Sequence, residues 1–220
     1  MKIKVKSIVK SFSGMQRGML VLCRLLFLPF CVLIVSCVSF SGIPKEPKKK
    51  KPQNLFSPSP IIANRGIKTA LALERFFMAQ VPDANVLKVR RLSRLYVFES
   101  SLEGINSDIA FAQMCLETGF LRFGGLVTED MNNFCGLGAI NAVQRGNRFN
   151  TEQEGVRAHI QHLKAYGSAE ALRMPLIDPR YKWVNPKGKA PTVYDLSGTW
   201  ASDPDYGKKL ADILKRMSAF

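Results

Sequence analysis

Apolar residues from position 67 onward recur with the period of α-helices rather than with the alternation of strands. Spacings of three and four residues run through 67–80, 84–101, 107–117 and 154–166, so each segment can bury one helical face. Thr151 with Glu154 forms a capping box, so Thr151 is expected to cap the last of these segments. Asp203 is expected to cap a further helix, because Asp is a favourable N-cap and the proline after it suits the first helical position. The pattern therefore predicts a body built from amphipathic helices.

In residues 107–138, a short helix ends at a glutamate and a glycine-rich turn follows. Ser107 is the expected N-cap, and Gly119 stands where a helix end favours a left-handed residue. Glu117 then lies near the negative end of the helix dipole, with three apolar residues close behind it: Phe120, Leu121 and Phe123. Both features disfavour the charged carboxylate and raise its pKa. Such a carboxyl group can act as a general acid in glycoside cleavage, although an ordinary surface glutamate would show the same spacing.

Four segments carry a recognisable set of motifs: AQMCLETGF at Ala112–Phe120, NNFCGLG at Asn132–Gly138, EGVRAHIQHLKAY at Glu154–Tyr166 and WASDPDYGKKL at Trp200–Leu210. In this order they resemble the glucosaminidase family of peptidoglycan hydrolases, which includes autolysins and the flagellar muramidase, and they cover most of residues 98–220. The resemblance implies a mainly α (α+β) fold: a lysozyme-like helical domain with a short hairpin or loop lobe. It also implies cleavage of the β-1,4 glycosidic bond after N-acetylglucosamine, with Glu117 as the general acid.

Five further positions are predicted to form the site. Tyr206 matches a tyrosine that the resemblance places near the catalytic glutamate, so we rank it second after Glu117 as a catalytic residue. Asn133 is expected to line the cleft because its amide can donate to and accept from sugar groups, although Asn-Asn pairs are also common in turns. The other predicted substrate-binding residues are Gln113, Phe134 and Trp200. Phe134 is more typical of a core residue, and a core role suits Trp200 equally well.

A partner for the general acid cannot be assigned by position. Many relatives carry a longer hairpin that supplies a second carboxylate, whereas this chain has no Asp or Glu between Gly138 and Asn150. The available carboxylates are Glu129, Asp130 and Glu152. A water-activating carboxylate would lie roughly 6.5–9.5 Å from the acid and a nucleophile about 5 Å away, and the N-acetyl group of the substrate is a third option.

The domain has few residues that could carry metal or thiol chemistry. Cys115 and Cys135 are its two cysteines, and we expect buried free thiols, with a disulfide as the alternative. His159 and His162 are three residues apart in one helix without an evident third ligand, so we expect hydrogen-bonded histidines rather than a zinc site. We predict neither a cofactor nor a metal.

The N-terminal part differs in composition from the rest. Residues 1–60 hold 11 Lys and Arg against one Glu in a chain of net charge +15, so the charge belongs mainly to a leader and tether. Such a distribution does not suit nucleic-acid binding, which needs basic residues on the folded part. The apolar run 25–38 has the size of a signal-peptide core and contains IVSC, which resembles a bacterial lipobox ending at Cys37. We therefore predict a signal peptide over 1–37 with lipidation at Cys37, an uncleaved anchor or plain secretion being the alternatives.

Residues 38–62 are rich in proline and lysine and read as a tether, which leaves 63–220 as the catalytic domain. We predict a monomeric lipoprotein of the cell envelope that acts on peptidoglycan, anchored to a membrane and facing the periplasm or the cell exterior. One alternative is a muramidase or lytic transglycosylase, which is disfavoured because the Glu-Ser and Gly-Leu-Met-Gln signature is absent. Another is a non-catalytic peptidoglycan-binding lipoprotein, which the missing hairpin carboxylate supports.

Overall fold

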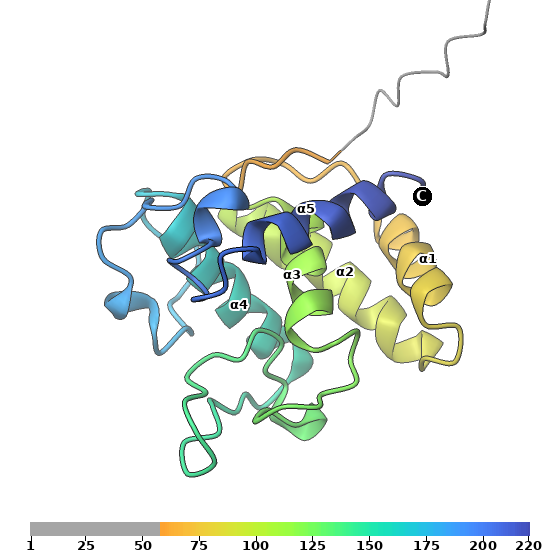
Figure 1. The fold of residues 1–220 in the computed structure, drawn as a ribbon, viewed down its shortest axis with the longest axis horizontal. Coiled ribbons are helices and arrows are strands. Elements are labelled where there is room, and N and C mark those ends of the chain that lie inside the picture. Colours follow the sequence, from red (N-terminus) through yellow and green to blue (C-terminus); the bar gives the residue numbers. More distant parts are fainter. Residues whose placement is uncertain (1–57) are drawn as a thin grey trace, which may run out of the picture. The chain divides into compact units, whose positions relative to one another are not determined.

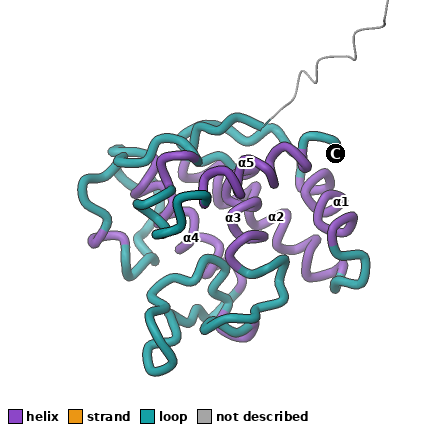
Figure 2. Tube along the Cα trace, viewed as in Figure 1, coloured by secondary structure: helices purple, strands orange, loops and turns teal. Residues whose placement is uncertain are grey.

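Helices form the regular structure of residues 58–220, the part of the chain that this computed structural model describes (Figure 1). The α-helices are α1 (Ala70–Gln80), α2 (Val86–Glu103), α3 (Ser107–Glu117), α4 (Glu152–Gly167) and α5 (Tyr206–Met217), and the short 3-10 helices are η1 (Glu129–Met131), η2 (Tyr181–Trp183) and η3 (Tyr194–Leu196). Within these residues Figure 2 shows no strand, and only two isolated bridges occur, Ile61 with Thr192 and Ser197 with Ala201. The mainly α prediction is confirmed, and the lobe between α3 and α4 is a loop (Figure 1).

The predicted signal peptide, the lipidation site Cys37 and most of the tether lie outside the described residues. Between residues 58 and 220, none of the helices combines the length and the apolar composition needed to cross a bilayer.

The helix that ends at Glu117 lies at the centre of the fold. It packs against α2, α4 and α5, and Figure 1 shows it running among them. Every residue from Ser107 to Cys115 is buried, so the prediction of one buried face was wrong for this helix. A helix enclosed on all sides must satisfy its polar side chains internally, because a buried polar group without a partner costs free energy.

Side chains near the start of α3 also determine where α1 begins. The backbone N–H groups of Ile67 and Lys68 donate to the Asp108 carboxylate over 2.9 and 3.1 Å. This anchoring keeps residues 67–69 out of the helix that the periodicity predicted to begin at 67. At α3 itself the N-cap is Asn106 rather than Ser107, since its side-chain oxygen accepts from two backbone N–H groups of the first turn.

The predicted cap of α4 is confirmed, whereas the predicted start of α5 is wrong. Thr151 caps α4 as expected, its hydroxyl accepting from the Glu154 N–H over 3.1 Å, while the Glu154 carboxylate accepts from the N–H of Asn150. In contrast, α5 begins at Tyr206, later than predicted. Asp203 caps a turn ahead of the helix, where its carboxylate accepts from the Asp205 N–H over 2.9 Å.

A buried ion pair holds the long connection between α4 and α5 to the helical body. Lys164 lies 3.0 Å from Glu103, and both side chains are 1% exposed. Glu103 also accepts from the backbone N–H groups of Arg173 and Met174. The loop is therefore tied to α2 and α4 near its start, and farther along it carries Trp200.

Candidate active site

A left-handed turn directly follows α3. Gly119, Phe120 and Leu121 have φ values of 55°, 56° and 62°, and Gly119 confirms the predicted left-handed residue at the helix end. Bulky residues in this region cost roughly 1 kcal/mol each, so other contacts must maintain the turn. Thr118 supplies two of them, since its hydroxyl accepts from the Leu121 N–H over 2.9 Å and donates to a carbonyl of α3. The chain thus turns away sharply just after Glu117.

Only one oxygen of the Glu117 carboxyl group is occupied by protein donors. Oε1 accepts a 2.8 Å hydrogen bond from Trp200 Nε1 and a short one from the Tyr206 hydroxyl. Oε2 has no hydrogen-bond partner among residues 58–220, and a Cβ placed on Gly136 would lie 3.9 Å from it. When this carboxyl group is protonated, the proton therefore belongs on Oε2, because Oε1 already accepts from two donors.

Burial raises the pKa of Glu117, although the hydrogen bonds from Tyr206 and Trp200 act in the opposite direction. The residue as a whole is exposed, yet protein atoms surround the carboxyl group closely enough for the loss of hydration to dominate. The upward direction agrees with the prediction. The protonated form is thus favoured more than in an ordinary surface glutamate, which suits a proton donor.

A small pocket of about 160 Å³ adjoins this carboxyl group. Its lining residues are Glu117, Thr118, Phe123, Gly125, Leu126, Val127, Asn133, Gly136 and Ala139. Apolar side chains and glycine backbone make up most of these walls. Most of the lining residues belong to the loop lobe between α3 and α4, and Gly136, whose added Cβ would lie 3.9 Å from Oε2, is one of them.

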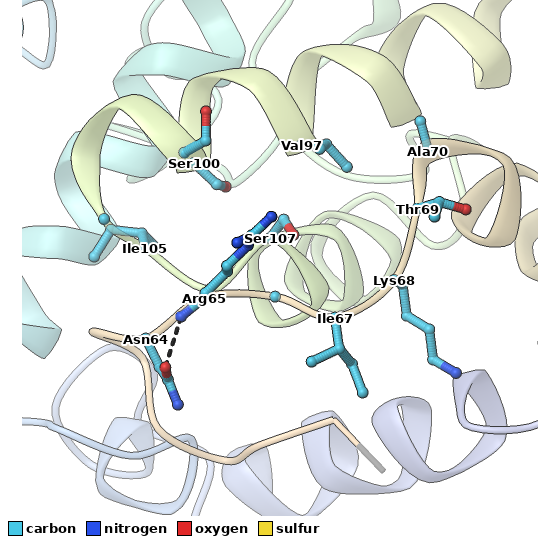
Figure 3. Close-up of a pocket in the computed structure, with 13 residues that line it drawn as sticks. Asn64, Arg65, Ile67, Lys68, Thr69, Ala70, Val97, Ser100, Ile105 and Ser107 are labelled. Atoms are coloured by element: carbon cyan, nitrogen blue, oxygen red, sulfur yellow. Dashed lines mark hydrogen bonds between the residues drawn. The ribbon is translucent and has the colours of Figure 1, made fainter. Parts of the chain in front are cut away.

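A larger cavity lies elsewhere. It has a volume of about 750 Å³ and is lined by the segment 64–70 and the C-terminal part of α2, with the side chain of Arg65 lying across it (Figure 3). Ser107, the first residue of α3, lines this cavity, whereas Glu117 is the last residue of the same helix, roughly 15 Å away at 1.5 Å per residue. None of the predicted site residues lines it, so cavity size does not locate the site here.

Three predicted substrate-binding residues lie in the interior. Gln113 and Phe134 are 0% exposed, and neither can touch a sugar in this structure. The Asn133 side chain lines the small pocket, but its amide NH₂ donates to the carbonyls of Leu137 and Asn147 and its oxygen accepts from the Leu137 N–H, each over 2.9 Å. We therefore correct two assignments: Phe134 belongs to the core, and Gln113 hydrogen-bonds to Tyr206 in the interior. Asn133 lines the pocket beside Glu117 as expected and also holds the loop lobe together, and its contact with substrate stays a prediction.

Trp200 and Tyr206 do meet Glu117, from different elements. Tyr206 is the first residue of α5 and is buried, whereas Trp200 comes from the preceding loop and is half-buried. The Trp200 ring packs on His162 and Tyr166 of α4, with centroids 5.1 and 5.2 Å apart. Both residues are thus placed to hold the carboxyl group, and Trp200 in addition presents partly exposed aromatic surface.

Behind Tyr206, a buried hydrogen-bond chain crosses the helical body. Gln113 Nε2 donates to the Tyr206 hydroxyl over 2.9 Å, His159 Nε2 lies 3.0 Å from Gln113 Oε1, and the Tyr96 hydroxyl lies 2.9 Å from His159 Nδ1. Burial lowers the pKa of His159 to about 3, so its ring is neutral at physiological pH. Sequence reasoning missed this chain. The available signal was that Tyr96 and His159 are polar residues on the apolar faces of two helices.

The three carboxylates considered as partners of Glu117 each form an ion pair instead. Glu129 pairs with Lys88, Asp130 with Arg148 and Glu152 with Arg91. Around the carboxyl group of Glu117, the only hydrogen-bonding side chains in the described part of the chain are Trp200 and Tyr206. None of the three candidate carboxylates hydrogen-bonds to Glu117.

The cysteines and histidines of the domain are also buried or hydrogen-bonded within the fold. Cys115 and Cys135 are buried free thiols, which confirms that expectation. His162 Nδ1 pairs with Asp178 over 2.8 Å, whereas His159 belongs to the hydrogen-bond chain, so the two histidines face different partners. Among residues 58–220, no group of three or more His, Cys, Asp or Glu side chains is arranged to hold a metal ion.

The sequence of this chain matches a known protein family and a bacterial relative. The glucosaminidase family model, described as mannosyl-glycoprotein endo-beta-N-acetylglucosaminidase, matches residues 94–219, more than half of the chain. An uncharacterized protein of Borreliella burgdorferi is 43% identical over 155 residues, which cover 70% of this chain and 76% of that protein. The matched region contains Glu117, Trp200 and Tyr206. This chain belongs to the glucosaminidase family and is, at that level of description, a peptidoglycan hydrolase.

Proposed function

We propose that the protein cleaves the β-1,4 bond after N-acetylglucosamine in peptidoglycan glycan strands, with Glu117 as the general acid. The observation that carries this proposal is the asymmetry of the Glu117 carboxyl group. Oε1 is held by Trp200 and Tyr206, whereas Oε2 is free beside the pocket. A glycosidic oxygen placed at Oε2 would receive the proton directly.

The two donors on Oε1 have a further consequence for proton transfer. As the proton leaves Oε2, negative charge develops on the carboxylate, and hydrogen bonds to a charged acceptor are stronger than those to a neutral one. Trp200 and Tyr206 therefore stabilise the product of the transfer more than its starting state. Because both donors are already in place, no reorganisation is needed during the reaction.

For the other half of the reaction, we propose that the substrate's N-acetyl group assists departure of the leaving group. Support comes from the three candidate carboxylates, all of which are held in ion pairs with lysine or arginine. Assistance of this kind is a recognised exception to the two-carboxylate scheme. It predicts products that retain the anomeric configuration, which proton NMR of freshly formed reducing ends would reveal.

We also propose that the chain is exported and held at a membrane through a lipid on Cys37, with the domain facing the peptidoglycan as a monomer. The support is the apolar run and the IVSC sequence that precedes the proline- and lysine-rich tether. Metabolic labelling with a fatty acid should mark the wild type and fail to mark Cys37→Ser.

The catalytic proposal is tested by Glu117→Gln, which is nearly isosteric but has no carboxyl proton to donate. General acid catalysis contributes about 10²–10⁴-fold, so lysis of purified sacculi should fall by at least about 100-fold while the circular dichroism spectrum is unchanged. Asp130→Asn is the matched control, because it also exchanges a carboxyl group for an amide but alters an exposed ion pair. Full activity of Glu117→Gln would refute the proposal.

Product analysis separates the alternatives. Reducing N-acetylglucosamine ends support the proposed bond, whereas reducing or anhydro-muramic acid ends indicate a muramidase or a lytic transglycosylase. Binding to sacculi without release of soluble fragments by the wild type would indicate the non-catalytic peptidoglycan-binding protein. The absence of Asp and Glu between Gly138 and Asn150 supports that alternative.

A further inference from the structure

The hydrogen-bond chain behind Glu117 links four helices. It runs from Tyr96 on α2 to His159 on α4, then to Gln113 on α3 and Tyr206 on α5, and it ends at Glu117 Oε1. Its first four members are buried. Since water does not reach these atoms, each polar group has to be satisfied by its neighbour in the chain, and the direction of one hydrogen bond determines the next.

The direction follows from the chemistry of each group. The Gln113 NH₂ donates to Tyr206, so the Gln113 oxygen faces His159 and can only accept. His159 Nε2 must therefore carry the ring proton. In a neutral imidazole this leaves Nδ1 as an acceptor, which receives the hydrogen bond of the Tyr96 hydroxyl. Every donor in the chain then points toward Glu117.

A reversed chain is also sterically conceivable and would change the site. If the Gln113 amide were turned over, its oxygen would face Tyr206, and the Tyr206 hydroxyl would donate to Gln113 instead of Glu117. Glu117 would then lose one of its two donors, or would place its own proton on Oε1, on the side of the protein interior. In the first case the proton on Oε2 is released less readily, because fewer donors stabilise the carboxylate that remains. In the second case the proton lies on Oε1, away from the pocket.

We propose that His159 and Tyr96 are positioning residues that fix the orientation of the Gln113 amide, so that the Tyr206 hydroxyl donates to Glu117. Neither residue touches the reacting atoms. His159 acts through its Nε2–H group and Tyr96 by keeping His159 in the required tautomer. This inference rests on the proposed role of Glu117 as the general acid.

The pH dependence that follows involves few other groups. The titratable side chains nearest Glu117 are Tyr206 from α5 and Cys135 from the loop lobe, and the pKa of both is raised by burial first and by the Glu117 charge second. From α4, His159 lies behind Gln113, and His162 with its partner Asp178 lies behind the Trp200 ring. Loss of the Tyr206 hydrogen bond would therefore act mainly on Glu117, raising its pKa.

A matched pair of variants tests the inference. The side-chain nitrogen of glutamine reaches about as far as Nε2 of histidine, whereas that of asparagine reaches only as far as Nδ1. His159→Gln should therefore still donate to Gln113, but His159→Asn should not. Because the general acid must be protonated, kcat/KM falls as pH rises through the Glu117 pKa, and this alkaline limb should move upward by roughly one pH unit in His159→Asn. It should stay near the wild-type position in His159→Gln.

Controls separate positioning from loss of stability. Phe111→Leu perturbs the core beside Tyr96, with which Phe111 makes an edge-on contact at 5.7 Å, but it removes no hydrogen bond, so its pH profile should match the wild type. If His159→Asn does not fold, Tyr96→Phe carries the same test, since it removes only the terminal hydroxyl. An unshifted limb in the folded variant, or an equal shift in His159→Gln, overturns the inference.

Titration of the ¹³C-labelled Glu117 carboxyl group, assigned with Glu117→Gln, provides a readout that needs no turnover. A raised midpoint in His159→Asn supports the positioning role even if the wild type cleaves no glycan, in which case the proposed function alone fails. A wild type that cleaves glycan, together with an unchanged midpoint in His159→Asn, overturns the positioning role alone.

Discussion

Acid should weaken the fold through His159, and the size of the effect follows from its environment. The ring is fully buried between α2 and α3, and burial lowers its pKa from 6.5 to about 3. In the unfolded chain the same ring takes up a proton at its ordinary pKa. Between these two values the unfolded state therefore binds more protons than the folded state, so stability falls as the pH is lowered.

The magnitude is obtained by linkage. At pH 7 the unfolded ring is mostly neutral and the contribution is small. At pH 5 it lies 1.5 pH units below the ordinary value of 6.5, and the folded state loses about 2 kcal/mol relative to pH 7. For a body of this size, such a loss corresponds to a decrease in Tm of roughly 4–8 °C.

The assay is thermal or urea unfolding at pH 7, 6 and 5, followed by circular dichroism. His159→Gln has no ring to protonate, so its stability should change by about 2 kcal/mol less than the wild type over this range. His162→Gln controls for the other histidine of the chain. If the wild type and His159→Gln lose stability in parallel, His159 is not held neutral by burial and this reasoning fails.

Two further substitutions test how the site is supported. Lys164→Met should destabilise the protein by about 3–5 kcal/mol in urea unfolding, because it leaves Glu103 as a buried unpaired carboxylate. Arg148→Met, which removes an exposed ion pair, should have little effect, and equal losses in the two variants would contradict the argument. Gly155→Ala should reduce both stability and lysis, since its Cβ would lie 1.7 Å from a backbone oxygen of the loop lobe. Gly124→Ala, with no atom within 4 Å of the added Cβ, is its control and should behave like the wild type.

Local features were readable from the sequence because they depend on residues close together in the chain. The Thr151 cap of α4 and the left-handed Gly119 are both set by backbone geometry over a few residues. The upward shift of the Glu117 pKa was also predicted from its immediate neighbours and the end of its helix. Helix starts were less accurate at α1, where a carboxylate some 40 positions away holds the backbone of Ile67 and Lys68.

Only the tertiary structure decided which polar atoms meet. Gln113 reaches His159 across 46 positions and Tyr206 across 93, and no periodicity or spacing reports such pairings. Periodicity identified apolar faces, but α3 is enclosed by three helices, so its polar side chain at Gln113 became an interior link rather than a sugar contact. The sequence thus determined most of the helices and the place of Glu117 at the end of one of them, whereas packing determined which oxygen of its carboxyl group is left without a hydrogen bond among residues 58–220.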